Sequence, residues 1–438
     1  ELLGIGKNRM QFSTFLPDES EPLLLFLENF CKDIKKIGPS PVKPVIIQKQ
    51  EKPCSETLKA IVKAHNAFAC QDCGKCTSSC PLALSGKQYS PRSIVASIIA
   101  GDIDSRHVKK DIWSCLTCGL CYERCPSDVN FPEFIRDIRC SLSGSKDDEK
   151  CQAHGGFFQS LMRSMTSPDL KPKRWEKLPK DIKLDPKSKT LFFGGCAPYF
   201  DVFFRNYHGA EASNILVDSL RLLNFFDIKP AILNHERCCG HDLLWSGDRE
   251  NFLKLAELNI EFINSLGIEE LITSCPECYK TIALNYKEHG IEPDFKVTHI
   301  YEFLENEIDK GAVSFNQLDR CITYQDSCRL NRQSAVDDLP RKLINRLMPE
   351  SFKEMQDSKN SALCCGNCAW TGCDSYSKAL QVKRIRQAHA TGSNLLVTSC
   401  PKCQIHLRCA MEDPFLGEEL SMEMKDLTSI IAETICWD

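Results

Sequence analysis

The sequence lacks three features that would assign it to large classes of protein. Its longest apolar runs, such as PLLLFL at 22–27, are far shorter than the roughly 20 apolar residues that cross a bilayer. Its formal net charge of −4 gives no broad basic field, so we expect no nucleic-acid partner. It also has no glycine-rich dinucleotide fingerprint and no P-loop, so we expect other chains to bind any flavin, NAD or ATP.

Cysteine, in contrast, is abundant, with 27 in a chain of 438 residues. Small secreted proteins use disulfides because their cores are small, but a chain of this length buries a core without them. The apolar share of 42% and the charged share of 26% are those of an ordinary globular protein. Cysteines clustered at x2 spacing indicate thiolate ligation of metal in a reducing compartment, so we expect a cytoplasmic location.

The pattern along the chain divides it into an extension, two linkers and two kinds of folded region. We expect an N-terminal extension and linker over 1–59, with an amphipathic helix at 22–37. A helical domain with two cysteine clusters follows over 60–140, and a polar, Lys- and Pro-rich linker over 141–188. From 189 onward strands alternate with helices, which predicts α/β units with largely parallel sheets.

The α/β region is duplicated. Its equivalent cysteines lie 132, 126 and 125 positions apart, in the pairs Cys196 and Cys328, Cys239 and Cys365, and Cys275 and Cys400. We therefore expect two modules, 189–310 and 311–438, related by a pseudo-twofold axis. Each of these cysteines follows a strand or a turn at the edge where open α/β sheets bind their ligands.

The helical domain carries the first metal constellation. Residues 70–81 and 115–126 both fit C-x2-C-x2-C-x3-C-P, the run of two-cluster ferredoxins. In this run three cysteines hold one cubane and the fourth holds the neighbouring one. We predict two cubane [4Fe-4S] clusters, one held by Cys70, Cys73, Cys76 and Cys125 and the other by Cys115, Cys118, Cys121 and Cys80. Two zinc knuckles are the alternative, but zinc sites need neither the third x2 cysteine nor the repeated C-P.

Each α/β module carries five cysteines, including an adjacent pair followed by glycine. Module one has Cys196, Cys238, Cys239, Cys275 and Cys278, and module two has Cys328, Cys364, Cys365, Cys400 and Cys403. Five thiolates exceed the four that a cubane needs, and adjacent cysteines fit a larger, opened cluster better than one compact cube. Strained vicinal disulfides are the alternative, but the two downstream C-P-x-C pairs argue against them.

On these motifs the chain resembles the D subunit of heterodisulfide reductase, a fused equivalent of the C and B subunits. The resemblance covers roughly residues 60–410. It implies a non-cubane [4Fe-4S] cluster in each CCG module, and a substrate disulfide that lies between the two clusters and is split with one sulfur going to each. The run around Cys328, YQDSCR, departs from the tyrosine–histidine–aspartate–proline–cysteine–histidine pattern of many relatives, and this removes imidazoles near module two.

The resemblance implies an oxidoreductase subunit that passes electrons through two cubanes to two non-cubane clusters, where a disulfide such as that of coenzyme M and coenzyme B is cleaved. Its expected partners are a flavin-containing A-like subunit or a membrane cytochrome b, which would hold it at the cytoplasmic face of a membrane. The alternative is an electron-transfer subunit without its own substrate, serving a flavin dehydrogenase of the glycolate, lactate or glycerol-3-phosphate type, or a bifurcating or ring-reducing complex.

Several other residues near the clusters need interpretation. His241 directly follows Cys-Cys-Gly and is the best candidate for a catalytic proton donor. Trp245 and Trp370 occupy matching positions in the two modules, and we expect both to pack around the clusters. The basic run 171–177 is expected to be solvated linker.

Overall fold

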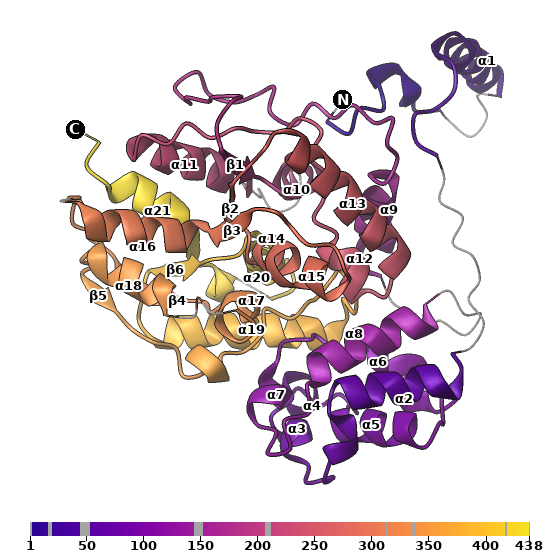
Figure 1. Cartoon of the computed structure of the whole chain (residues 1–438), viewed down its shortest axis with the longest axis vertical. Helices are drawn as coiled ribbons and strands as arrows, with labels where there is room; N and C mark the ends of the chain where they lie inside the picture. The colour runs from indigo at the N-terminus through magenta and orange to yellow at the C-terminus, as the bar shows by residue number, and fades with distance from the viewer. Residues whose placement is uncertain are drawn as a thin grey trace.

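A computed structural model describes residues 2–15, 20–43, 53–143, 152–205, 212–311, 313–334, 336, 338–416 and 418–437. It forms a helical lobe and a larger α/β body, with the first long helix lying apart from both (Figure 1). The expected linker residues 44–52 and 144–151 lie outside the described residues. Among the described residues, no helix combines the length and the apolar character needed to cross a membrane.

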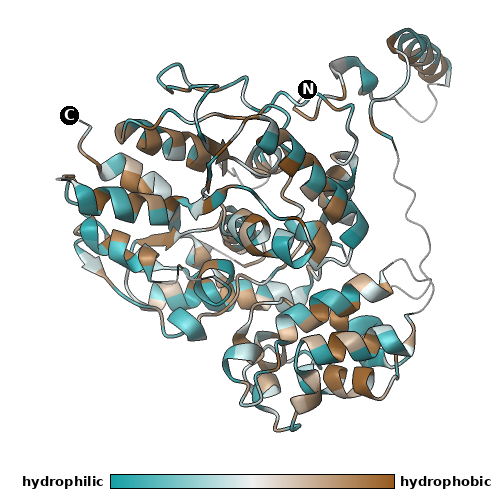
Figure 2. Ribbon diagram, in the orientation of Figure 1, coloured by the Kyte–Doolittle hydropathy of each residue, from teal (hydrophilic) through white to brown (hydrophobic). Residues whose placement is uncertain are grey.

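The N-terminal extension carries the amphipathic helix expected at 22–37. Helix α1 (Ser20–Ile37) follows a short 3-10 helix, η1 (Lys7–Arg9), and none of its residues is buried. Its leucines are exposed to solvent. Figure 2 shows brown, apolar residues along this helix, which lies apart from the rest of the ribbon. Arg9 donates to the carbonyl of Gly38 at 3.0 Å and so ties the two ends of the extension together.

The helical lobe is built from short helices separated by the cysteine turns. Its elements are α2 (Ser55–Ala64), η2 (Ala67–Ala69), α3 (Lys75–Ser78), α4 (Pro81–Leu84), α5 (Pro91–Ile99), η3 (His107–Asp111), α6 (Ile112–Ser114), α7 (Leu120–Glu123) and α8 (Phe131–Leu142). Pro81, the proline of the first C-P pair, is the first residue of α4. At this position its missing N–H costs no helical hydrogen bond. The lobe therefore extends slightly beyond the expected bounds of 60–140.

Module one contains a parallel sheet of order β1-β2-β3, formed by Thr190–Phe193, Glu270–Thr273 and Lys296–His299. Ala231 adds a parallel bridge to Leu191 on the outer side of β1. The helices are α10 (Ala197–Phe204), α11 (Ala212–Phe225), α12 (His241–Trp245), α13 (Arg249–Ser265), α14 (Pro276–Lys280), η5 (Thr281–Asn285), α15 (Tyr286–Glu288) and α16 (Ile300–Lys310). Asp248 caps α13 by accepting from the amide of Asn251.

Module two repeats this plan with a parallel sheet of order β5-β4-β6-β7, formed by Ser351–Phe352, Cys321–Tyr324, Leu395–Thr398 and Glu423–Asp426. The bridge at Ala231 corresponds to β5, and β1, β2 and β3 correspond to β4, β6 and β7. Its helices are α17 (Cys328–Asn331), α18 (Leu339–Arg346), η6 (Lys359–Ser361), α19 (Ser375–Ala390), α20 (Pro401–Met411), η7 (Glu418–Leu420) and α21 (Leu427–Thr434). The expected duplicated α/β fold with parallel sheets is confirmed.

The two modules exchange their last helices. Helix α16 follows the last strand of module one but packs against α18 of module two, and α21 follows the last strand of module two but packs against α11 of module one. An ion pair between Arg346 and Glu305 joins α18 to α16. Figure 1 shows both contacts at the end of the body remote from the helical lobe. The boundary expected at 310/311 thus divides the sequence into two modules, but helices of the two modules pack against each other across it.

The expected linker over 141–188 is a packed part of the body. Residues 152–188 include η4 (Ala153–Gly156) and α9 (Phe157–Ser164), and Phe158 is fully buried against Trp370 with ring centroids 4.2 Å apart. The Lys and Pro content of this segment suggested a solvent-exposed linker. Its apolar residues at helical spacing instead cover the junction of the two modules. The assignment of this segment as a linker was wrong for its described part.

The helix exchange predicts that a residue of module two stabilises module one. Ile431→Ala in α21 is expected to lower the free energy of unfolding by about 2–5 kcal/mol, because it removes buried methyl groups and leaves a cavity. Anaerobic denaturant titration measures the change. Leu25→Ala on α1, where Leu25 is 59% exposed, is the matched control and should change it by less than about 0.5 kcal/mol. Equal effects of the two substitutions would contradict a core role for α21.

Candidate iron–sulfur sites

The predicted ligands of the first cubane line one pocket of the helical lobe. Cys70, Cys73, Cys76 and Cys125 all line this pocket, and Cys121 of the second predicted set lines it as well. Cys73 is exposed and Cys70 is partly exposed, so the pocket lies at the protein surface. The thiols that the spacing assigned to one cluster are therefore brought together from two separate motifs.

The predicted ligands of the second cubane converge deeper in the lobe. Burial raises the pKa of Cys80 to about 12, and the charges of Cys115 and Cys118 add to the shift. Burial also raises the pKa of Cys121 well above its usual value, with contributions from the same three thiols. Buried thiols of this kind lose their protons readily only when a cation offsets the charge. The donor set thus fits an iron–sulfur cluster.

The two cubane motifs share one backbone shape. Gly74 and Gly119 precede α3 and α7 with φ of +78° and +87°, a conformation that favours glycine. One position before the second cysteine of each motif, Asp72 and Thr117 also have positive φ, +52° and +45°. This conformation is uncommon for aspartate and an outlier for a β-branched residue. Thr117 is fully buried, so its neighbours must hold it in place.

In module one the five thiols form a continuous cluster below the sheet edge. The Sγ atoms of Cys196 and Cys238 lie 2.9 Å apart. The remaining three are linked in the order Cys239, Cys278 and Cys275 by thiol contacts that raise the pKa of Cys278. All five line one pocket. A methyl group on Gly195 would come within 2.7 Å of Cys278 Sγ, so only glycine allows this approach.

Module two repeats the arrangement. The thiol of Cys364 contacts those of Cys328 and Cys365, and the contact with Cys364 is the main cause of the raised pKa of Cys328. Cys365 in turn contacts Cys403, which contacts Cys400. Gly366 has φ +94°, and a methyl group there would meet the carbonyl of Ser377 at 2.7 Å. None of the ten CCG cysteines, all of which the structure describes, forms a disulfide, so neither adjacent pair is bridged.

The four thiol sets follow one another through the molecule. Burial dominates the raised pKa of Cys121, and the charge of Cys76 in the first cubane set adds to it. Burial likewise dominates for Cys118, and Cys328 of module two adds to it. Contact with Cys403 lowers the pKa of Cys400, while burial and the charge of Cys275 in module one raise it. The order is therefore first cubane set, second cubane set, module two, module one.

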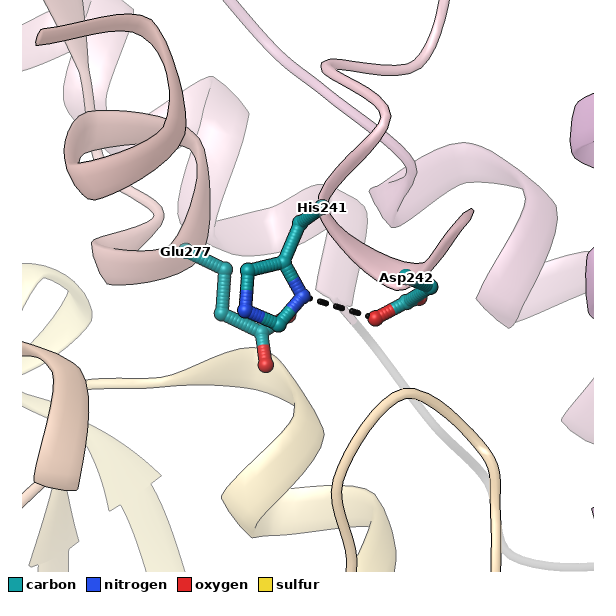
Figure 3. Close-up of side chains that lie close together, drawn as sticks. All are labelled: His241, Asp242 and Glu277. Carbon is teal, nitrogen blue, oxygen red and sulfur yellow. Dashed lines mark hydrogen bonds and ion pairs between the residues drawn. The ribbon is translucent and has the colours of Figure 1, made fainter. Parts of the chain in front are cut away.

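A buried ion cluster joins the two C-P-x-C turns. The middle residues of these turns, Glu277 and Lys402, form an ion pair of 2.5 Å across the pseudo-twofold axis. Lys402 Nζ also contacts Asp242. Figure 3 shows His241 between Asp242 and Glu277, donating from Nδ1 to Asp242 Oδ1 at 2.8 Å. The three groups are close enough to hold a cation, but the ammonium group of Lys402 already contacts both carboxylates.

Both ring nitrogens of His241 are occupied. Its Nε2 accepts from Arg329 Nε at 3.1 Å, and because a guanidinium only donates, the proton of the neutral ring lies on Nδ1. Burial lowers the pKa of His241, which favours this neutral form. A role as proton donor therefore stays a prediction, and it requires Asp242 or Arg329 to give up its bond to the ring.

Sequence reasoning missed a buried ion pair behind Cys196. Arg174 lies in the basic run that we expected to be solvated, but its side chain is fully buried and pairs with Glu236 at 3.0 Å. Glu236 accepts from the amide of Gly195 at 2.7 Å, and burial raises its pKa to about 7. The pair thus fixes the turn that carries Cys196. Nothing in the local sequence separates Arg174 from the exposed lysines beside it.

Comparison with known proteins agrees with the motifs and the fold. The profile of the cysteine-rich domain (CCG) matches residues 190–283 and 322–408, and that of the 4Fe-4S dicluster domain matches 69–130. The chain thus contains two cysteine-rich CCG domains and a 4Fe-4S dicluster domain, and it is similar to the heterodisulfide reductase D subunits. The expected order of a two-cluster domain followed by two CCG modules is thereby confirmed, and the chain is an iron–sulfur electron-transfer protein.

Its relatives are oxidoreductase subunits. The D subunits of dihydromethanophenazine:CoB–CoM heterodisulfide reductase from Methanosarcina acetivorans and Methanosarcina barkeri are each 26% identical, over 84% of this chain and 93% of their own length. The B subunit of fumarate reductase (CoM/CoB) from Methanothermobacter marburgensis is 26% identical over 82% of this chain and 71% of its own. The probable iron-sulfur-binding oxidoreductase FadF from Bacillus subtilis is 24% identical over 84% and 60%.

A solved structure shares the fold. The crystal structure of a hypothetical protein from Helicobacter pylori superposes with a TM-score of 0.50 at 11% identity, over 93% of this chain and 75% of that one. The expected packing role of Trp245 and Trp370 also holds, since both side chains are fully buried in the body.

The thiol sets predict the metal content. Four four-iron clusters correspond to about sixteen irons per chain, measured by iron and sulfide analysis after anaerobic reconstitution. Cys73→Ser should remove about four of these irons, because it deletes a ligand of the first cubane. Cys373→Ser, which also changes an exposed cysteine but lies outside the four sets, should leave the iron content unchanged. Zinc in the CCG modules, or about eight irons in all, would contradict four clusters.

Proposed function

We propose that this chain carries electrons from a redox partner through the helical lobe to the two CCG modules, and that a disulfide is reductively cleaved there. The observation that carries the proposal is the placing of the thiol sets. The exposed Cys73 lines the first pocket, Arg332 of module two donates to the carbonyl of Cys118 in the second set, and Pro401 and Lys402 of module two complete the pocket of module one. Each disulfide takes up two electrons and two protons and yields two thiols.

The proposed cofactors are two cubane and two non-cubane four-iron clusters, held by the cysteines assigned above. When bound, such clusters supply one-electron carriers over a wide range of potential. The surrounding residues determine the rest. The structure describes all ten CCG thiols, none of them is tied up in a disulfide, and each set comes from three turns at one sheet edge.

The pocket of module one suits a sulfur substrate. Pro401 and Lys402 of module two complete its wall, so a molecule bound there contacts both modules. Lys402 places an ammonium group in this wall, where Asp242 and Glu277 hold it in position. The names of the Methanosarcina and Methanothermobacter relatives refer to coenzymes M and B. This supports the mixed disulfide of these two coenzymes as the substrate.

A partner would deliver electrons at the first cubane set. Phe68, five positions before the exposed Cys73 in the chain, is 61% exposed and offers a docking partner an apolar contact on the same lobe. A flavin-containing A-like subunit or a membrane cytochrome b is the proposed donor. The chain would then work in the cytoplasm or at the cytoplasmic face of a membrane.

The test is oxidation of reduced methyl viologen by the mixed disulfide of coenzymes M and B, followed anaerobically with the reconstituted full chain. We expect turnover by the wild type, and a loss of at least a hundredfold in Cys238→Ser and in Cys364→Ser, because each substitution removes a thiol from one CCG set. Electron paramagnetic resonance should show the cubanes of both variants still reducible. Cys436→Ser, outside the sets, should keep wild-type turnover.

A second candidate function is electron transfer without a substrate of its own. The ion cluster of Glu277, Lys402 and Asp242 favours it, because these side chains occupy the space between the two C-P-x-C turns. The relationship to FadF, whose name gives no sulfur substrate, also supports it. A fully loaded wild type that does not turn over this disulfide or related ones would exclude the first proposal and leave the second.

A further inference from the structure

Three buried arginines surround the loop of the second cubane set. Arg139 lies on α8 of the helical lobe, Arg329 on α17 of module two, and Arg332 directly after α17. Arg139, Arg329 and Arg332 are only 0%, 2% and 9% exposed, respectively. We call these three residues the arginine collar.

The collar binds the loop through its backbone carbonyls. Arg139 donates to the carbonyls of Ile112 and Cys115, each at 2.7 Å from Nη2. Arg332 Nε donates to the carbonyl of Cys118 at 2.7 Å. The loop from 112 to 118 is thus held from two sides, by the lobe and by module two.

Arg329 holds the strained residue of the same loop. It donates to the carbonyl of Thr117 at 3.2 Å and to its Oγ1 at 3.0 Å. Its Nη2 also lies 3.3 Å from Cys368 Sγ, and that thiol lies 2.9 Å from Thr117 Oγ1. Because Nε of the same guanidinium donates to His241, Arg329 connects the cubane loop to both modules.

Among the described residues, no carboxylate forms an ion pair with the collar. The hydrogen bonds of its arginines go to carbonyls, an amide side chain, a hydroxyl, a thiol and an imidazole. Arg332 Nη2 is buried and has no hydrogen-bond partner in the part of the chain that the structure describes. Some buried arginines of the body are paired, such as Arg341 with Asp326 at 2.7 Å, whereas Arg237 and Arg384 also lack an ion pair among the described residues. Burying three unpaired charges is costly unless another anion offsets them.

The thiols supply the anions that the collar faces. Burial is the largest influence on the pKa of Cys118, and Arg332 is the largest influence that opposes it. Arg329 and Arg332 also oppose the raised pKa of Cys328, which comes mainly from Cys364. When they ligate iron these cysteines are thiolates, so the collar lies between two anionic groups, the second cubane set and the module-two set.

We propose that the arginine collar raises the reduction potential of the cluster held by the Cys115–Cys118 loop, so that an electron from the first cubane is held at the junction of the lobe and the modules. This inference rests on the proposed clusters. A cluster that accepts one electron gains one negative charge, and a nearby buried cation stabilises the reduced form more than the oxidised one. The electron comes from the first cubane, which is oxidised in the same step.

The charges near the first cubane set differ from those near the second in the way that electron transfer toward the second cubane requires. The arginine in the wall of its pocket is Arg92, which is partly exposed and pairs with Asp72 at 3.2 Å. A solvated and paired charge changes a potential little, whereas buried and unpaired charges change it strongly. These charges therefore favour transfer from the first to the second cubane.

The test is a potentiometric titration of the reconstituted full chain, followed by electron paramagnetic resonance. Cys73→Ser identifies the signal of the first cubane by its loss. In Arg332→Gln the signal of the second cubane should titrate at lower potential, with a reduction equilibrium at least tenfold less favourable, or about 59 mV for one electron. The signal of the first cubane should not move.

Two further variants separate charge from packing. Arg332→Lys keeps the charge and loses the fork of donors, so it should titrate within threefold of the wild type. Arg92→Gln removes a paired, solvated charge and should leave the second cubane unchanged. If Arg332→Gln loses iron, Arg329→Gln carries the same test from the other side of the loop.

The proposal is overturned if neither glutamine variant shifts the second cubane, or if Arg332→Lys shifts it as far as Arg332→Gln. These outcomes differ from failure of the proposed function. A wild type that lacks turnover but holds its iron still reports the potentials, and a wild type with fewer than two cubane signals refutes the cluster assignment itself.

Discussion

In each module, five thiols from three distant chain segments have to meet at one edge of a sheet. A parallel sheet meets this requirement because its strands all end at the same edge, and the turns after β1 and β2, or β4 and β6, carry the outer cysteines. The adjacent pair arrives on a third turn that ends in glycine. The close approaches at Gly195 and Gly366 exist because a side chain at either position would displace a ligand or a helix.

The same crowding sets the electrostatics. Thiolates gathered in a buried volume repel one another, so cations have to lie near them, and the chain supplies these cations in two different ways. Around module one two of them are paired, Arg174 with Glu236 and Lys402 with Glu277, whereas Arg237 donates to backbone carbonyls. At the junction with the helical lobe the described arginines Arg139, Arg329 and Arg332 form no ion pair, so their charge is available to the clusters. The protein thereby makes two similar modules electrically different.

The departure of the YQDSCR run from its relatives acquires a physical meaning in this setting. Where many relatives have histidine after the cysteine, Arg329 donates at once to His241, to Thr117 and toward Cys368. At this position the permanent positive charge of Arg329 replaces an imidazole, whose charge depends on pH. Arg329 thereby occupies Nε2 of His241, which follows the adjacent pair of module one, whereas module two has an imidazole from another segment, His406, with Nδ1 3.3 Å from Cys365 Sγ.

The amino-acid sequence alone determined the duplication, the parallel α/β class and most long helices, and it supplied the predicted ligand sets. These follow from spacing and periodicity, which are local or repeat at a fixed interval, so α11, α13, α18 and α19 lie where apolar positions recur every three to four residues. Tertiary structure alone decided the helix exchange, the burial of 152–188, the ion pair of Glu277 and Lys402, and the arginine collar. Each of these joins residues far apart in the chain, and an arginine or lysine in a sequence carries no mark of whether its charge will end in water or beside a buried thiol.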